Sequence, residues 1–465
     1  RDSSTSRGLG DVYKRQGYTN PRESGHDFFT IGHTSTSVSL ACGLAKARDL
    51  KGGHENIIAV IGDGSLSGGE AYEGLSNAGE MGTNLIIVVN DNEMSIAENH
   101  GGLYQNLKEL RDTEGRSSCN FFRSLGLDYL YVGEGNDIPS LVAAFAKVKD
   151  TSRPTVVHIH TQKGKGYAPA EADREEFHWE MPFDLETGKP KVDCSGMEDY
   201  HSLTGKFLLE KMKEDHTVVA ISSGTPTVIG FTPERRKQAG RQFVDVGIAE
   251  EHAVALASGI AAGGGRPVYG VYSTFIQRCY DQLSQDLCIN GNPAVITVFM
   301  GTVAGMNDVT HLGFFDIPLI SNIPNMVYLA PTCSEEYFAM LEWAVRQTEY
   351  PVAIRVPGVA VVHRKEEFDT DYSELNRYKM TARGETVAIL ALGSFYDLGQ
   401  ALKNKLREES GVEATLINPR YITGLDEPML EELKVGHRIV VTLEDGVLDL
   451  SLIHISEPTR RRGIS

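Results

Sequence analysis

Short apolar runs separated by longer amphipathic stretches recur along this chain of 465 residues, and this alternation is the feature that most constrains its fold. The runs at 57–61 and 85–89 are predicted to form buried strands, and the stretch at 70–80 between them is predicted to form a helix. An alternation of this kind is typical of parallel sheets with helices on their faces. The sequence therefore predicts an α/β protein built from doubly wound parallel sheets.

Polar and charged segments divide the chain into three blocks. The first block covers 17–170 and the second covers 199–362, with a polar linker predicted at 171–198. A charged linker is predicted at 363–384, and a third α/β block at 385–449 is expected to stop before a full domain is built. The remaining predicted strands are at 155–160, 218–221, 243–246, 268–271, 294–299, 352–355 and 387–392, and the remaining helices are at 200–212, 250–262, 276–289 and 334–347.

The two ends of the chain share no pattern with their neighbours. Residues 1–16 and 450–465 resemble translated adapter sequence, so both are expected to be non-native tails and are excluded from the fold prediction. On this interpretation the native segment is about 17–449 and is cut at both ends.

The acidic balance of the chain limits its partners. A formal net charge of -18 provides no broad attraction for nucleic acid or for an anionic membrane. No apolar run is long enough to predict a transmembrane helix. The six cysteines form no C-x-x-C pair, which disfavours a disulfide framework or a zinc site and favours a reducing, cytoplasmic location. Any phosphate group that binds must therefore be held by a few local basic groups, by helix N-termini or by a metal.

Two triplets that follow predicted strands carry the strongest functional signal: Gly62-Asp63-Gly64 and Asn90-Asp91-Asn92. In a strand–helix–strand unit both triplets would lie at the carboxyl edge of neighbouring parallel strands, which is where open α/β sheets bind ligands. The Asp63 carboxylate, the Asn92 amide oxygen and a nearby backbone carbonyl, such as that of Met94, could supply three of the hard oxygen ligands that Mg²⁺ prefers. A diphosphate could supply two more.

Each triplet alone has a simpler interpretation, as a strand-to-helix turn or as an Asn/Asp turn. Asp63 and Asn92 are 29 residues apart, and the occurrence of both triplets on consecutive strands at this spacing favours a thiamine diphosphate site. The glycines would let the backbone approach the phosphates closely, and the N-terminus of the following helix would favour their negative charge.

Several stretches of the chain resemble the 1-deoxy-D-xylulose-5-phosphate synthase family. IGHTSTS (31–37), VIGDGSLSGGEAYEGL (60–75), VVNDNEMSIAENHG (88–101) and KGKGYAPAE (163–171) are similar to its diphosphate-binding domain. VDVGIAEEHAV (244–254), VYSTFIQRCYDQ (271–282) and THLGFFD (310–316) are similar to its pyrimidine-binding domain. The resemblance implies a thiamine-diphosphate-binding fold, with two doubly wound domains and a truncated transketolase C-terminal-like domain. Transketolases and the E1 components of 2-oxo-acid dehydrogenases fit these stretches less well.

The resemblance assigns the proton chemistry to three residues. Glu250 would hydrogen-bond the aminopyrimidine ring of the cofactor, and His178 and His311 would move protons to and from the acceptor oxygen. Each residue also has a structural interpretation, because an acid at a helix N-terminus complements the helix dipole and a lone histidine is often a structural group.

The resemblance also assigns two sets of binding residues. The cofactor contacts are Gly32, His33, Thr34, Gly64, Ser65, Asn92, Tyr167, Glu250 and Phe275, and the substrate contacts are Tyr272, Arg278, Arg355 and Asp308. Guanidinium groups suit phosphate, although either arginine could instead form an ion pair. The Ser/Thr-rich turn could equally cap a helix, and Phe275 could belong to the core. Met300 replaces an arginine that is usual in the family, and Asp308 stands one place closer to His311 than the usual acid.

The implied activity is the decarboxylative condensation of pyruvate with D-glyceraldehyde 3-phosphate. The products would be CO₂ and 1-deoxy-D-xylulose 5-phosphate, a precursor of isoprenoids, thiamine and pyridoxal, and the implied assembly is a homodimer with thiamine diphosphate and Mg²⁺. A transketolase, an E1-like enzyme, or a non-catalytic fragment that binds the cofactor without turnover are the alternatives.

Overall fold

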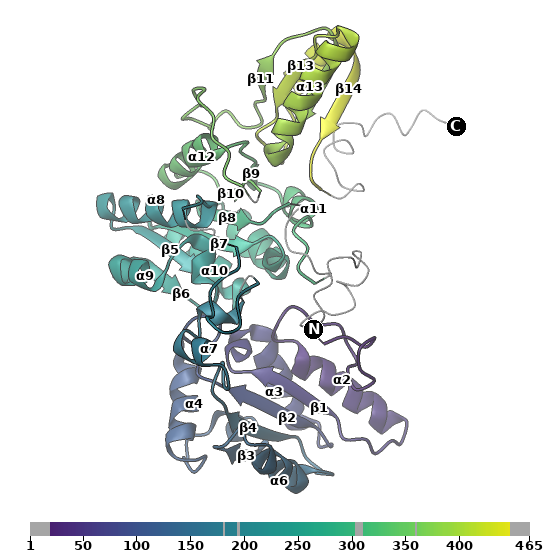
Figure 1. The fold of residues 1–465 in the computed structure, drawn as a ribbon, viewed down its shortest axis with the longest axis vertical. Helices are drawn as coiled ribbons and strands as arrows, with labels where there is room; N and C mark the ends of the chain where they lie inside the picture. The colour runs from purple at the N-terminus through teal and green to yellow at the C-terminus, as the bar shows by residue number, and fades with distance from the viewer. Residues whose placement is uncertain (1–18, 180–181, 193–195, 303–309, 359, 447–465) are drawn as a thin grey trace.

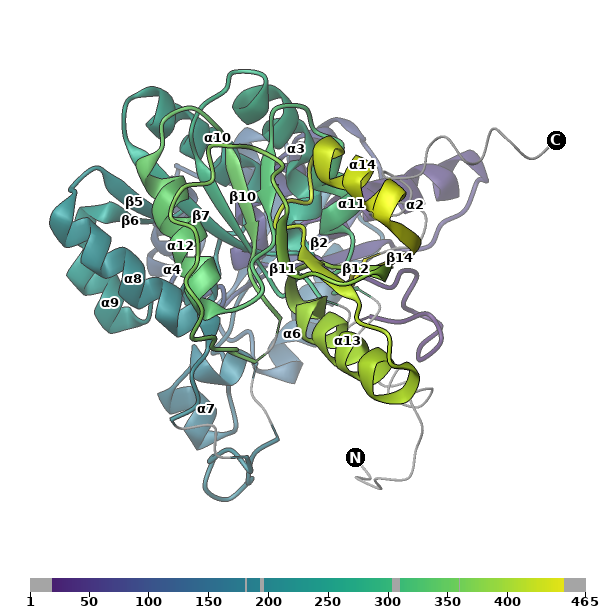
Figure 2. The same cartoon turned by 90° about the horizontal axis from the view of Figure 1, so that it is seen from above.

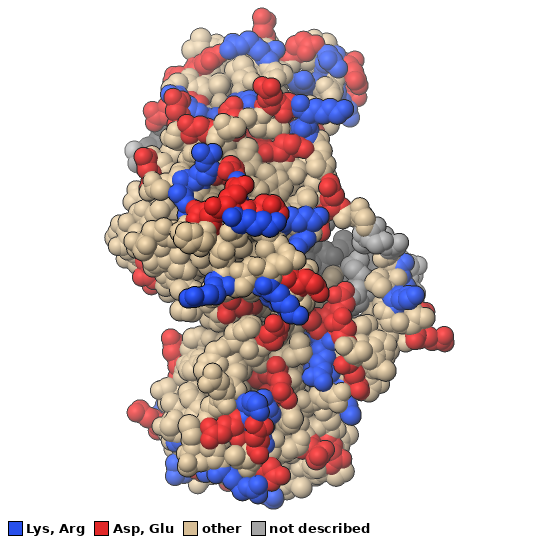
Figure 3. Space-filling view, turned by 90° about the vertical axis from the view of Figure 1, so that its left-hand side faces the viewer, with Lys and Arg blue, Asp and Glu red and all other residues tan. Residues whose placement is uncertain are grey.

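The computed structural model describes residues 19–179, 182–192, 196–302, 310–358 and 360–446. Within these ranges the chain forms three α/β units that follow one another along the long axis of the molecule (Figure 1). None of the described helices combines the length and the hydropathy that a bilayer crossing needs. On the face shown in Figure 3, lysine and arginine side chains are interspersed with aspartate and glutamate side chains.

The first unit is a four-stranded parallel sheet in the order β1-β2-β4-β3. Alternate side chains of β2 belong to different cores: Ile87 and Val89 pack with α2, α3 and α4, while Ile86 and Val88 pack with α6. Because β2 is buried on both faces, its sequence is a continuous apolar run. The strands are β1 (Ile58–Gly62), β2 (Ile86–Asp91), β3 (Asp128–Val132) and β4 (Thr155–His160), and the helices are α2 (Ser37–Leu50), α3 (Gly69–Glu80), α4 (Gly102–Asp112), α5 (Phe121–Ser124), α6 (Ile138–Val148) and α7 (Ala168–Ala172), with 3-10 turns at Gly64–Ser67 and Glu176–His178.

The second unit is a six-stranded parallel sheet in the order β6-β5-β7-β8-β10-β9. Helices α8 and α12 contribute to the core on one face, and α10 and α11 contribute to the core on the other, so this unit is doubly wound. Its strands are β5 (Val218–Ser222), β6 (Phe243–Asp245), β7 (Arg266–Tyr272), β8 (Val295–Phe299), β9 (Val327–Leu329) and β10 (Val352–Arg355), and its α-helices are α8 (Tyr200–Glu214), α9 (Pro233–Ala239), α10 (Glu250–Ala262), α11 (Asp316–Ser321) and α12 (Ser334–Arg346), with 3-10 turns at Pro226–Ile229 and Gly240–Gln242.

The third unit is a mixed four-stranded sheet in the order β11-β13-β12-β14, in which β11 runs antiparallel to β13. Helices α13 and α14 lie on opposite sides of this sheet, each over its own small core (Figure 2). The elements are β11 (Lys379–Ala382), β12 (Thr386–Ala391), α13 (Tyr396–Ser410), β13 (Thr415–Asn418), α14 (Glu427–Gly436) and β14 (His437–Leu443), with a 3-10 turn at Gly393–Phe395.

The α/β fold predicted from the alternation is confirmed, and the strands at 155–160 and 352–355 and the helix at 250–262 have the predicted bounds. The segment predicted as a helix at 276–289 is helical, but it is not a regular α-helix, because a 3-10 turn at Phe275–Cys279 is followed by a π-helix at Gln282–Cys288. Side chains three residues apart align in a 3-10 turn. This turn therefore directs Phe275 and Arg278 to the same side.

The third sheet begins with β11, which lies inside the segment 363–384 that was predicted to be a linker. The two terminal segments predicted to be non-native lie outside the described residues.

Candidate active site

The turns after β1 and β2 lie side by side at the carboxyl edge of the first sheet. The two strands pair in parallel register with Gly62 opposite Asn90, and the backbone N–H of Asp63 donates to the carbonyl oxygen of Asn90 over 3.1 Å. The backbone N–H of Asn92 in turn hydrogen-bonds the Asp63 carboxylate. The strand register thus brings the two predicted triplets together.

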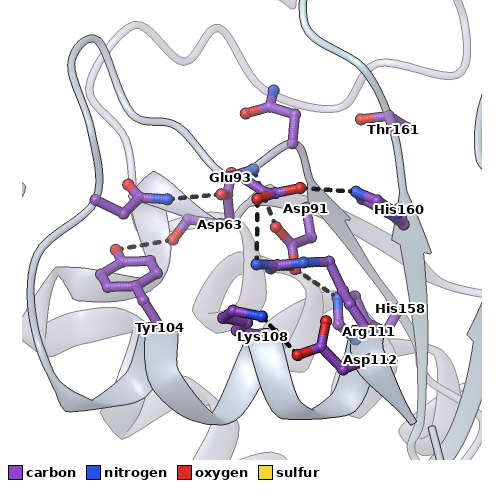
Figure 4. Close-up of polar contacts among 12 residues, drawn as sticks. Asp63, Asp91, Glu93, Tyr104, Lys108, Arg111, Asp112, His158, His160 and Thr161 are labelled. Carbon is purple, nitrogen blue, oxygen red and sulfur yellow. Dashed lines mark hydrogen bonds and ion pairs between the residues drawn. The ribbon is translucent and has the colours of Figure 1, made fainter. Parts of the chain in front are cut away.

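Asp63 is a buried acid at this edge, with 1% of its surface exposed, and Asp91 beside it is fully buried. Its carboxylate accepts a hydrogen bond from Asn99 Nδ2 at 2.7 Å, and the Tyr104 hydroxyl donates to its backbone carbonyl at 3.1 Å (Figure 4). Burial, followed by the negative charge of Asp91, raises the pKa of Asp63 to about 7. A carboxylate in this environment is stabilised by a bound cation.

A tight turn keeps Asn92 and Met94 close to each other. Glu93 between them has a left-handed backbone with φ 68°, and the backbone N–H of Met94 donates to Asn92 Oδ1 over 3.1 Å. Met94 also forms an antiparallel bridge with Glu98, which closes the loop. The amide oxygen of Asn92 retains a second lone pair, so it can still act as a ligand.

Two polar atoms near these turns, Ser95 Oγ and Asn99 Oδ1, are buried without a hydrogen-bond partner among the described residues, as is the hydroxyl of the predicted cofactor contact Tyr167. An unpaired buried polar group costs about 1–3 kcal/mol, so a ligand that pairs with these oxygens would be stabilised. Gly64 approaches Ser95 so closely that an added Cβ would lie 2.8 Å from Ser95 Cα. These oxygen-rich surroundings fit a cation with a diphosphate.

Lys163 is a candidate that the sequence analysis did not single out, although it lies in the quoted stretch KGKGYAPAE. Its ammonium group donates to the carbonyl oxygens of Ser95 at 2.7 Å and Ile96 at 3.3 Å. Burial lowers the pKa of Lys163, and the charge of Asp63 opposes this shift. The signal that could have found it is the need for local cations in an acidic chain that binds phosphate.

Glu250 begins α10, on the second unit, and only 3% of its surface is exposed. Burial raises the pKa of its carboxyl group, and the nearby charge of Arg278 opposes this effect. Arg278 Nη1 lies 3.4 Å from Glu250 Oε2, and the same guanidinium donates to the backbone carbonyl of Thr34 on the first unit. Glu250 is therefore a buried acid at the junction of the two units.

Aromatic rings from both units surround this junction. The rings of His33, Phe275 and His311 lie with their centroids 5.1–5.6 Å apart, in edge-to-face arrangements. His33 Nε2 is 2.8 Å from Thr274 Oγ1, and His311 Nδ1 is 2.8 Å from Thr310 Oγ1. Three residues predicted from separate parts of the sequence therefore form one cluster.

Short contacts join this junction to the turn after β1. The Ile248 N–H donates to Ser67 Oγ at 2.8 Å, and the Ser35 hydroxyl donates to the Ser65 carbonyl at 2.8 Å. Asp63 immediately precedes the 3-10 turn at Gly64–Ser67, and Ile248 lies two residues before Glu250. These contacts therefore bring the turn of Asp63 and the start of the Glu250 helix together within one chain.

His178 lies at the end of a 3-10 turn, close enough to Lys163 for their charges to interact. Burial, followed by the charge of Lys163, lowers the pKa of His178 to about 4, so its ring is neutral at neutral pH. Its place near Lys163 associates it with the loop beside Asp63. Tyr167 packs nearby on Phe177 and Phe183, with ring centroids 5.7 Å and 5.9 Å apart.

The predicted substrate residues are placed in different surroundings. Arg355 is buried and paired with Asp316 at 2.7 Å and with Asp445 of the third unit, which matches the ion-pair interpretation. Tyr272 borders the cluster, with its ring centroid 5.9 Å from that of Phe275. The prediction for Asp308 falls outside the described residues.

Family models match the chain in three successive parts. Residues 11–120 match "1-deoxy-D-xylulose-5-phosphate synthase", residues 198–361 match "Transketolase, pyrimidine binding domain", and residues 377–456 match "Transketolase, C-terminal domain". A solved structure of transketolase from Pichia stipitis is 17% identical, covers 89% of this chain and 73% of that chain, and gives a TM-score of 0.47. The matched domains and the described sheets define a transketolase-type enzyme.

Curated relatives narrow this class. The 1-deoxy-D-xylulose-5-phosphate synthases of Desulforudis audaxviator and Lachnoclostridium phytofermentans are each 36% identical over 93% of this chain, and the alignments cover 73% and 74% of those proteins. The 1-deoxy-D-xylulose-5-phosphate synthase 1 of Geobacter sulfurreducens is also 36% identical, over 93% of this chain and 73% of that protein. The chain belongs to the 1-deoxy-D-xylulose-5-phosphate synthase family, and this membership implies thiamine diphosphate as its cofactor.

The close approach of Gly64 to Ser95 generates a test of the site's packing. Gly64→Ala should lower the free energy of unfolding by about 1–3 kcal/mol, because the new methyl group meets backbone, and should weaken thiamine diphosphate binding. Gly69→Ala is the matched control, since a Cβ there meets nothing within 4 Å. Thermal unfolding and cofactor titration by fluorescence measure both effects. Equal behaviour of the two variants would contradict the close approach.

Proposed function

We propose that the protein condenses pyruvate with D-glyceraldehyde 3-phosphate, releasing CO₂ and forming 1-deoxy-D-xylulose 5-phosphate. The observation that carries this proposal is the junction at which the Asp63 edge of the first sheet meets Glu250 of the second unit within one chain. Family membership along 93% of the chain supports the choice of reaction.

The carboxyl edge of the first sheet is the proposed seat of Mg²⁺ and the cofactor's diphosphate. Asp63, Asn92 and the carbonyl of Met94 are the proposed metal ligands, and the buried unpartnered oxygens of Ser95 and Asn99 support a polar ligand there. Gly64, Ser65 and Lys163 would contact the diphosphate. When bound, thiamine diphosphate supplies the electron sink that decarboxylation needs.

Glu250 is proposed to hold a proton at a ring nitrogen of the aminopyrimidine. Burial raises the pKa of its carboxyl group, which favours the protonated form and suits a hydrogen bond to a ring nitrogen. Phe275, three residues before Arg278, would provide the apolar wall against the ring. Gly32 and Thr34 belong to the loop that meets this wall from the first unit.

Histidines on both sides of the junction are proposed to handle the protons of the acceptor. His311 lies in ring contact with His33, the predicted cofactor contact, with centroids 5.4 Å apart, so it borders the proposed cofactor site. His178 is neutral at neutral pH and can accept a proton. Arg278 and Tyr272 are the proposed groups for the acceptor's phosphate end, whereas Arg355 would have to leave Asp316 or Asp445 to reach it. Asp308 stays a prediction.

The reaction itself is tested by CO₂ release from carboxyl-labelled pyruvate, with and without D-glyceraldehyde 3-phosphate. We expect release to depend on thiamine diphosphate and Mg²⁺ and to be accompanied by 1-deoxy-D-xylulose 5-phosphate, which mass spectrometry identifies. Cofactor binding without CO₂ release would support the non-catalytic alternative. Two-carbon transfer from a ketose phosphate, with no use of pyruvate, would support a transketolase.

Replacing the buried acid tests its role in proton transfer. Glu250→Gln should lower kcat by about 100-fold or more, because a positioned acid–base group contributes at least this factor. Thiamine diphosphate affinity should change only a few-fold, since the diphosphate edge is untouched. Glu251→Gln, at the neighbouring and less buried acid, is the control. A near-normal kcat for Glu250→Gln would remove the assignment.

Replacing the buried acid of the first sheet tests the metal assignment. Asp63→Asn keeps the shape of the side chain but removes its charge, so the Mg²⁺ concentration that half-saturates cofactor binding should rise about 10-fold or more. Asp112→Asn is the control, because that carboxylate pairs with Lys108 on the surface. Titration of Mg²⁺ at fixed thiamine diphosphate measures the effect, and an unchanged midpoint for Asp63→Asn would contradict the assignment.

A homodimer and a cytoplasmic location stay predictions that follow from the family and from the cysteine pattern. Sedimentation velocity tests the first, and a single-chain species at micromolar concentration would contradict it. Cell fractionation tests the second.

A further inference from the structure

A buried network of charged side chains flanks the turn that carries Asn92 (Figure 4). The Asp91 carboxylate is fully buried and lies 2.5 Å from Arg111 Nη1 and 2.9 Å from His158 Nε2. His158, also fully buried, places its other ring nitrogen 2.7 Å from the Tyr129 hydroxyl. Asp91 is thus held directly from α4 and β4, and Tyr129 of β3 in turn holds His158.

The residue on the other side of Asn92 is held by the same arginine. Arg111 Nη2 lies 3.5 Å from Glu93 Oε2, and His160 Nε2 lies 3.0 Å from Glu93 Oε1. Glu93 has a left-handed backbone, which a residue with a side chain adopts only when its surroundings enforce it. The Glu93 N–H also donates to Asp91 Oδ1 at 3.1 Å, which ties the two acids to each other.

Helix α4 supports both of the turns that meet at the sheet edge. Tyr104, near its start, donates to the backbone carbonyl of Asp63, and Arg111, near its end, pairs with Asp91 and Glu93. Tyr104 and Arg111 are seven residues apart, so they lie two turns apart on one face of the helix. A guanidinium group suits this task because its planar fork can engage two carboxylates at once.

We propose that Arg111 is a positioning residue for the metal site. By pairing with both Asp91 and Glu93, it fixes the turn that presents the Asn92 amide oxygen and the Met94 carbonyl to the cation. This inference rests on the proposed function, because it takes these two groups as metal ligands. It adds a residue that touches neither the metal nor the substrate and acts through the backbone of the turn.

The direct test is metal binding by the full chain with thiamine diphosphate present, using Mn²⁺ as the probe and its electron paramagnetic resonance signal as the readout. Arg111→Lys keeps the charge but loses the fork, and should weaken Mn²⁺ binding about 10-fold, as changes to groups behind metal ligands do. At saturating metal and cofactor, kcat should stay within about two-fold of the unsubstituted protein, because the assembled site is the same. A purely structural role would instead lower kcat and thermal stability without a selective shift of the metal midpoint.

A second variant and a matched control keep the test decisive. Glu93→Gln removes only the ion pair between Arg111 and Glu93, whose side chain is 50% exposed. It should weaken Mn²⁺ binding by a smaller factor than Arg111→Lys does. Lys108→Gln, one turn before Arg111 on α4, alters a surface pair with Asp112 and should match the unsubstituted protein.

The outcomes separate this inference from the function on which it rests. Mn²⁺ binding by Arg111→Lys and Glu93→Gln within two-fold of Lys108→Gln would overturn the role of Arg111. In that case Asp63→Asn still reports on the metal site itself. If Asp63→Asn also binds Mn²⁺ normally, the metal assignment fails as well, whereas a loss confined to Asp63→Asn leaves the proposed function intact.

Discussion

The parallel pairing of β1 with β2 is the constraint on which the rest of the site depends. It sets Gly62 opposite Asn90, so the two polar turns leave the sheet side by side at its carboxyl edge. Their side-chain oxygens therefore lie close together. Convergence has an electrostatic cost, because Asp63 and Asp91 are buried acids that raise each other's energy of ionisation. The structure offsets this cost for Asp91 with Arg111 and His158, whereas Asp63 forms no ion pair among the described residues and has only the more distant charge of Lys163 nearby. The sheet therefore divides its two acids into a structural one and one that is available to a cation.

The second unit contributes an aromatic ring, a guanidinium group and a buried acid to the candidate site. Its 3-10 turn at Phe275–Cys279 aligns an aromatic ring with a guanidinium group, and both meet the first unit at the loop of His33 and Thr34. Arg278 lowers the cost of burying Glu250 without forming a tight pair with it, since the closest atoms are 3.4 Å apart. A buried acid with a distant counter-charge can gain or lose a proton more readily than one in a close ion pair.

Local sequence patterns were sufficient for the central strands of the first two sheets and for one half of the site, but they missed β3, β9, β11, β13 and β14. Apolar runs identify the central strands, and the rule that parallel strands end at one edge correctly places Asp63 beside the Asn92 turn. The contact of Ser67 with Ile248 joins residues 181 positions apart. Such a contact produces no periodic pattern in the sequence, because it depends on how two folded units pack against each other. The pairing of Arg355 with Asp445 has the same origin, and from sequence a phosphate ligand and an ion pair look alike. The helix that follows β7 was predicted, but its 3-10 and π geometry was not, because its apolar spacing resembles that of an α-helix.

The placement of both halves of the site in one polypeptide has a consequence for dilution. The contacts between His33 and Phe275 and between Ser67 and Ile248 are intramolecular. Their stability therefore does not depend on the protein concentration. Separation of copies of this chain would therefore leave the turn of Asp63 and the start of the Glu250 helix joined. In a cell that makes few copies, the junction between the Asp63 edge and Glu250 is set by the folding of a single chain.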